Sequence, residues 1–239
     1  MKQLILKKLM LIAVLLTCNV TLAHDFEVDG IYYTIQSDSK KTVTVIYRGN
    51  SYSEYSHEYQ GTVIIPNTVN HNGLTYTVVS IGNDAFHGCD GLTSVSIGNS
   101  VTSIGYFAFS GCSGLTSISI GNGVTSIGND AFSFCTGISS ILSANPVPPT
   151  CDNQVFYNVN KETITLTVPQ ESVSLYKSAD TWKDFINITG KDMSGVKETL
   201  VDESEMPVEY YNLQGVKVEN PENGIFIKKQ GRKAEKVVM

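Results

Sequence analysis

The chain has 239 residues, a formal net charge of −6 and only 17% charged residues, so it has room for one or two domains. No Lys or Arg stands between Arg48 and Lys161. A nucleic-acid-binding protein needs cations against phosphate, so the composition argues against a nucleic-acid partner for this region. Its surface must be Ser, Thr, Asn and Gly with a few Tyr, which suits hydrogen bonding to a protein or glycan and equally suits a surface that binds nothing.

Residues 1–23 have the composition of a secretory signal peptide. Lysines charge the start, an apolar run follows, and small residues precede His24. The apolar run is too short for a spanning helix, so we expect no transmembrane segment after signal cleavage. As an alternative, Leu-Leu-Thr-Cys at 15–18 resembles a lipoprotein box, which would leave Cys18 as a lipid-anchored first residue.

Residues 24–61 predict a β-rich N-terminal cap. Asp29-Gly30 is a two-residue hairpin signal between two strand-like runs, and residues 42–47 form a third run. Three tyrosines then recur at helical spacing: Tyr52, Tyr55 and Tyr59. These phenols either form one face that binds a sugar or peptide, or they pack against the cap.

Residues 80–148 consist of three segments of 23 residues each, in which the same side chains return. The repeated residues are Ile81, Ile104 and Ile127; Phe86, Phe109 and Phe132; and Cys89, Cys112 and Cys135. A fixed period of this length is the signature of stacked repeats. Val95 and Ile97 share one face of a predicted strand, and Ala108 and Cys112 have the spacing of a short helical turn behind it. One unit cannot bury its apolar side alone, so we expect the strands to pair in parallel.

The repeat continues in degenerate form across 62–190. Residues 62–69 are a partial unit, and Asn72-Gly73 predicts a small β-protrusion before the next coil. Val155-Phe156 replaces the Ala-Phe pair of the earlier units, and a strand-like run follows. Apolar residues spaced by three in 172–185 predict a closing amphipathic helix. Trp182 and Phe185 are expected to seal the last coil.

The three repeated cysteines should stack as a ladder, one per coil. We expect buried free thiols that act as small apolar side chains. A disulfide between adjacent rungs is an alternative in an exported protein, although it needs strict geometry. A metal site is less favoured because the cysteines lack C-x-x-C spacing and a nearby His. We expect no cofactor.

The pattern V-T-S-I-G-x-x-A-F-x-x-C-x-x-L-T-S-V-x-I resembles the 23-residue BspA-like leucine-rich repeat of bacterial surface proteins. The likeness covers roughly residues 60–190. It implies an α/β repeat solenoid: a short stack of coils with a parallel β-sheet and short helical turns. It also implies a surface-exposed protein that adheres to host matrix proteins or to other bacteria.

The end of the chain changes character. Residues 191–207 are polar and acidic and are expected to form a linker. Residues 208–239 consist of short strand-like runs between Gly-containing turns, with basic residues gathered near the end. Their Y-N-L-x-G-x-x-V pattern resembles the C-terminal sorting tail of Bacteroidetes type-nine secretion cargo. The alternative is a small β-appendage whose basic edge prevents pairing with other chains.

No catalytic motif stands out. Asp84 and Asp130 share a repeat position but lie two coils apart, so we do not expect an enzyme. The expected ligand-binding face is the polar side of the parallel sheet, because solenoids usually bind on a concave sheet face. Its residues are Thr93, Ser94, Ser96, Thr116, Ser117, Ser119, Ser139 and Ser140. The expected function is exported adhesion to a protein or glycan, and the alternatives are a carbohydrate-active enzyme or a purely structural surface module.

Overall fold

The computed structural model describes residues 24–49, 51 and 57–193, together with the strands of the C-terminal tail. The chain divides into two units between Lys191 and Asp192, and each is described by itself. The predicted signal peptide with Cys18, the tyrosines Tyr52 and Tyr55, and most of the predicted linker lie outside the described residues.

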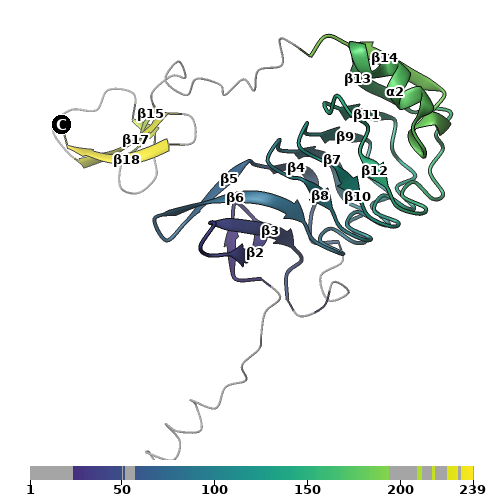
Figure 1. Ribbon diagram of the computed structural model, residues 1–239. Helices are drawn as coiled ribbons and strands as arrows, with labels where there is room; N and C mark the ends of the chain where they lie inside the picture. Colours follow the sequence, from purple (N-terminus) through teal and green to yellow (C-terminus); the bar gives the residue numbers. More distant parts are fainter. Residues whose placement is uncertain are drawn as a thin grey trace, which may run out of the picture. The chain divides into compact units, whose positions relative to one another are not determined.

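A six-stranded parallel sheet forms one wall of the first unit (Figure 1). Each coil contributes one strand. In spatial order these are β4 (Gly61–Ile65), β7 (Leu92–Ile97), β9 (Ser117–Ile120), β11 (Ser140–Ser143), β13 (Thr165–Pro169) and β14 (Asn187–Lys191). All neighbouring pairs run parallel, as the repeat predicts.

A second sheet forms the opposite wall and extends into the N-terminal cap. Its repeat strands are β6 (Leu74–Ile81), β8 (Ser103–Ile104), β10 (Ser126–Ile127) and β12 (Thr150–Cys151). The cap strands are β1 (Phe26–Val28), β2 (Ile31–Ser37) and β3 (Thr42–Ile46), and β3 pairs with β6 in parallel. The predicted β-rich cap is therefore confirmed, and it continues a sheet of the solenoid without a break.

Two hairpins form at the Asp-Gly and Asn-Gly signals. Asp29-Gly30 joins β1 to β2, and Asn72-Gly73 joins β5 (Thr68–His71) to β6, with positive φ at all four residues. The second hairpin is packed against the cap, because the Phe26 ring stacks on the His71 ring with centroids 4.1 Å apart. The predicted protrusion is thus anchored by the cap along part of its length.

The repeated side chains form continuous columns between the two sheets. Rings of consecutive coils stack with centroids 4.9 Å apart for Phe86 and Phe109, and 5.1 Å apart for Phe109 and Phe132. Phe156 continues the column from the degenerate fourth coil at 5.5 Å. The repeated isoleucines are buried beside them. Stacking buries an apolar side that no single coil can cover.

Tight turns connect the two sheets in each coil. The amide of His87 donates to the Asp84 carbonyl and the amide of Cys89 to the Phe86 carbonyl, both three residues back. Asp84, Phe107 and Asp130 share one repeat position, and each has a positive φ near 55°. A left-handed residue interrupts helical geometry, so turns stand where the residue spacing predicts a short helical turn.

The last coil is closed by three short helical pieces. The predicted helix over 172–185 is divided into η3 (Gln170–Ser172), α2 (Val173–Ser178) and η4 (Trp182–Asp184). The chain leaves α2 at Ala179 in an extended conformation, and Thr181 has a φ of 69°, so one helix cannot continue. Trp182 and Phe185 are buried against Phe156, as predicted.

The second unit contains a four-stranded antiparallel sheet. Its spatial order is β16 (Lys217–Val218), β15 (Glu209–Tyr211), β17 (Ile225–Gln230) and β18 (Lys233–Val238). The strand-like runs predicted for the C-terminal tail form this small β-sheet. Across the described residues of both units, no helix has the length and apolar character needed to traverse a lipid bilayer.

Candidate binding face

The outward face of the six-stranded sheet follows from strand alternation. In β7, Val95 and Ile97 are buried, whereas Ser94 and Ser96, which alternate with them, are half-exposed on the other side. Strand register extends each outward serine into a row across the sheet. The first row is Thr62, Ser94, Ser117, Ser140, Thr165 and Asn187; the second is Ile64, Ser96, Ser119, Leu142, Thr167 and Thr189. We call these two rows the outward face.

Hydroxyl groups within the outward face bond to each other across coils. Ser117 Oγ donates to Ser94 Oγ at 2.9 Å, and the hydroxyls of Thr167 and Thr189 lie 3.4 Å apart. A hydroxyl has one donor and two acceptor lone pairs, so a single mutual bond leaves acceptor capacity at these groups. The rows therefore present an ordered array of oxygens at the strand spacing of about 4.8 Å.

Three further predicted residues lie at one edge of these rows. Thr93, Thr116 and Ser139 are exposed. The hydroxyl of Thr116 donates to the Thr93 carbonyl at 2.9 Å, and that of Ser139 donates to the Thr116 carbonyl at 3.2 Å. The hydroxyl protons of Thr116 and Ser139 are used within the stack, which leaves the lone pairs of these two oxygens for a ligand donor. All eight predicted serines and threonines thus lie on one continuous surface.

Of the three predicted tyrosines, Tyr59 is the one that the structure describes, and it does not lie on this surface. Tyr59 is buried, with its ring tilted against Phe86 at a centroid distance of 4.6 Å, so it begins the ring column. Tyr59 therefore packs in the interior, and it cannot belong to the predicted tyrosine face that binds a sugar or peptide. Burial also raises the pKa of its hydroxyl.

Some residues of the outward face escape prediction from sequence. Ile64 is 52% exposed and Leu142 is half-buried, and both stand in the row of Ser96 and Ser119. Aligning the repeats by period would place Leu142 in this row. Strand β14 adds Asn187 and Thr189, which no repeat motif indicates.

The outward face is nearly free of charge. The six strands, as described, contain one charged residue, Lys191 at the end of β14. Elsewhere in the described residues, no three His, Cys, Asp or Glu side chains come together in a metal-binding group. An uncharged array can recognise a ligand by hydrogen bonds and shape, with little long-range electrostatic attraction.

The two carboxylates at equivalent positions lie in turns and not in the six strands of the outward face. Asp130 is buried, and its carboxylate accepts a hydrogen bond from the side-chain amide of Asn129. Asp84 is half-buried, and desolvation raises the pKa of its carboxyl group. Neither of these observations indicates that Asp84 and Asp130 act together on one substrate.

The cysteine ladder consists of free thiols. The thiol of Cys112 donates to the Phe86 carbonyl at 3.1 Å, and that of Cys135 to the Phe109 carbonyl at 3.0 Å. Burial raises the pKa of Cys89 to about 11. Cys151, which the repeat period does not indicate, is also mostly buried, and burial raises its pKa to about 12. Such thiols are protonated and unreactive at neutral pH.

Stacked coils, a parallel strand in each coil and continuous side-chain columns define a leucine-rich-repeat solenoid. Residues 64–179 match the BspA type leucine rich repeat region in six copies. A leucine-rich repeat protein from Bacteroides ovatus is 28% identical, with a TM-score of 0.50 over 70% of this chain. This chain spans 41% of that protein's length.

A second solved structure is a leucine-rich repeat protein from Bacteroides capillosus. It is 24% identical, with a TM-score of 0.47, over 60% of this chain and 96% of its own. A comparison with curated proteins finds no match.

Proposed function

We propose that this chain is an exported cell-surface binding protein that holds an extracellular protein or glycan on the outward face. The observation that carries the proposal is the pair of uncharged, in-register rows formed by β4 to β14. Buried Ile and Val on the inner side fix the backbone, so the outward hydroxyls are pre-organised. Pre-organisation lowers the entropy cost of binding.

The size of the outward face favours an elongated ligand. Six strands at about 4.8 Å spacing give a length of about 24 Å. Ile64 and Leu142 supply apolar contact within the second row, while serine and threonine oxygens supply acceptors on either side. A mixed surface of this kind resembles the composition of protein interaction surfaces. Many copies on one cell would add avidity to a weak single contact.

Surface location is part of the proposal. The composition of residues 1–23 supports export, and the motif in residues 208–239 supports sorting by a type-nine secretion machine. Lipid attachment at Cys18 is the alternative route to the surface. Mass spectrometry of the mature protein tests the proposal: a chain beginning near His24 supports signal cleavage, and a diacylglyceryl Cys18 contradicts it.

Lysine substitutions on the outward face test the binding proposal. The full chain is screened against extracellular matrix proteins, neutral glycans and whole bacterial cells. The variant Thr116→Lys/Ser117→Lys/Ser119→Lys then crowds the centre of both rows, while the lysine stems can reach solvent without unfolding the strand. We expect at least a tenfold loss of affinity with an unchanged melting temperature.

A matched control adds the same charge to the other wall. Thr102, Thr125 and Ser126 are serine or threonine residues at or beside the β8 and β10 strands, and Thr125 donates to the Thr102 carbonyl just as Thr116 donates to that of Thr93. Their replacement by Lys should leave binding intact. Equal loss in both variants would indicate a nonspecific charge effect, and no ligand in the whole screen would favour a purely structural module.

A further inference from the structure

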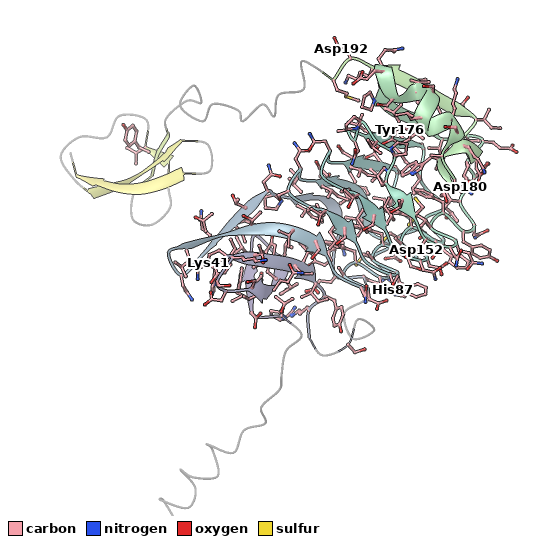
Figure 2. All side chains as sticks on the ribbon, viewed as in Figure 1. Lys41, His87, Asp152, Tyr176, Asp180 and Asp192 are labelled. Carbon is pink, nitrogen blue, oxygen red and sulfur yellow. The ribbon has the colours of Figure 1, made fainter. Side chains whose placement is uncertain are left out.

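Large aromatic side chains are exposed on the turns of the solenoid, outside both sheets. Their exposed fractions are 51% for Tyr106, 39% for Phe107, 48% for Phe134 and 51% for Tyr157. Phe134 and Tyr157 meet edge to face across two coils, with ring centroids 5.4 Å apart. The Phe134 amide also donates to the Tyr157 carbonyl at 2.9 Å, which fixes the pair in register. Figure 2 labels His87 and Asp152, which lie at the same edge of the solenoid.

Two of these aromatic residues occupy backbone positions that disfavour them. Phe134 has a φ of 59°, and earlier coils have Gly88 and Gly111 at its position. Phe107 has a φ of 54°, at the position of Asp84 and Asp130. Bulky residues are uncommon in the left-handed region, where Gly and Asp are favoured. Strained residues of this kind are characteristic of functional sites.

Packing within the chain accounts for these rings only in part. The interior column already contains Phe109 and Phe132, which are fully buried, and Phe107 and Phe134 lie two residues away from them on the outside. About half of each of these two side chains remains exposed and gains nothing for folding, and the backbone strain acts against stability. A contact with a molecule outside the chain would explain both the exposed rings and the strained backbone.

The surroundings of the pair are polar but weakly charged. The coil that carries Tyr157 also has exposed amide residues: Asn153, Gln154 and Asn158. Asp152 is exposed nearby in the sequence, whereas Asp130 is buried and bonded to Asn129. No Lys or Arg occurs between residues 49 and 160. Aromatic faces with amide groups and without cations suit a neutral ligand that has both hydroxyl groups and apolar C–H surfaces.

We propose that Phe134 and Tyr157 form a binding site for a neutral oligosaccharide, separate from the outward face, with Tyr106 and Phe107 extending it along the turns. The apolar side of a pyranose ring packs against the exposed aromatic faces. Its hydroxyls exchange hydrogen bonds with amide side chains and the Tyr157 phenol.

The variants that test this site restore the residues of the other coils. Phe134→Gly and Phe107→Asp relieve the positive-φ strain and remove the rings. Each should therefore raise the melting temperature slightly, while the double variant lowers affinity for neutral glucan, mannan and galactan oligosaccharides at least tenfold on an array and by calorimetry. Phe134→Tyr keeps an aromatic ring and should stay within about threefold of the unsubstituted chain.

Controls separate this site from the outward face. Leu175→Ser removes an exposed apolar side chain from α2 and should leave glycan affinity unchanged. For an oligosaccharide that the double variant no longer binds, the outward-face lysine variant should retain affinity, so either proposal can fail without the other. Unchanged glycan affinity in the double variant would overturn the site. The site would also be overturned if the unsubstituted chain bound no glycan at millimolar concentration. It would be overturned as well if the double variant lost affinity only for a protein ligand.

Discussion

The ring of Phe109 lies parallel to the ring of Phe132, with centroids 5.1 Å apart and planes that differ by only 3°. The two residues are 23 positions apart in the chain, one full coil. The same contact recurs between Phe86 and Phe109, so the repeat in sequence becomes a translation in space. The column begins at Tyr59 and ends edge to face on Trp182 and Phe185 through Phe156.

Removing a central ring should destabilise the whole first unit. Phe109→Ala leaves a cavity between two stacked rings that the parallel coils cannot close, so we expect a loss of about 3–5 kcal/mol in the free energy of unfolding. Urea denaturation followed by circular dichroism measures it. Phe107→Ala, two residues away and exposed, is the matched control and should change stability by less than about 0.5 kcal/mol. Equal effects would refute the column as the main core.

The closing segment depends on one phenol. The Tyr176 hydroxyl lies 2.7 Å from Ser143 Oγ and donates to the Asn145 carbonyl at 2.9 Å, which joins α2 to the end of the third coil. Tyr176→Phe leaves these buried partners unsatisfied and should cost about 1–3 kcal/mol. Emission of the single tryptophan, Trp182, reports unfolding of this segment. Tyr106→Phe on an exposed turn should have no measurable effect, and an equal loss there would contradict the bridge.

The thiol ladder should resist alkylation in the folded protein. Cys89, Cys112 and Cys135 are each at most 2% exposed, and burial raises the pKa of the Cys89 thiol to about 11. Iodoacetamide at pH 7.5, followed by peptide mass spectrometry, should leave all three unmodified until denaturant is added. A disulfide between any two of them in material kept under air would contradict the free-thiol ladder.

Stability should fall in alkaline solution. Burial raises the pKa of Cys89 from its ordinary value of 9.0 to about 11. The folded state therefore retains a proton that the unfolded chain loses between pH 9 and 11, so the free energy of unfolding decreases as pH rises through this window. Cys89 alone contributes on the order of 2–3 kcal/mol, at 1.36 kcal/mol per pKa unit. Cys89→Ala should have a shallower slope from pH 9 to 11, and an unchanged slope would assign the effect to other groups.

The period of the sequence predicts the interior of the molecule well, because a column needs only the same side chain at the same place in each coil. It predicts the second sheet poorly. Strands β8 and β10 contain two residues each, too few for an alternation pattern. The 172–185 segment has helical spacing, but its backbone turns at Ala179 and Thr181, where no Gly or Pro marks a break.

The two proposed binding surfaces were likewise predictable from the sequence only in part. Ser94, Ser117 and their neighbours are predictable from strand alternation, while Ile64 and Asn187 join the outward face only through strand register. Phe134 looks like one more substitution of a degenerate repeat. Its positive φ and its contact with Tyr157 emerge only from the backbone and the stacking of coils.

Hydroxyl-radical footprinting of the full chain with its bound ligand tests the central proposal most directly. Ile64 and Leu142 are reactive side chains on the outward face, and Leu175 on α2 is an exposed internal reference. The proposal predicts that ligand protects Ile64 and Leu142 from oxidation while Leu175 keeps its rate. Unchanged oxidation of both residues in a saturated complex would contradict binding through the outward face.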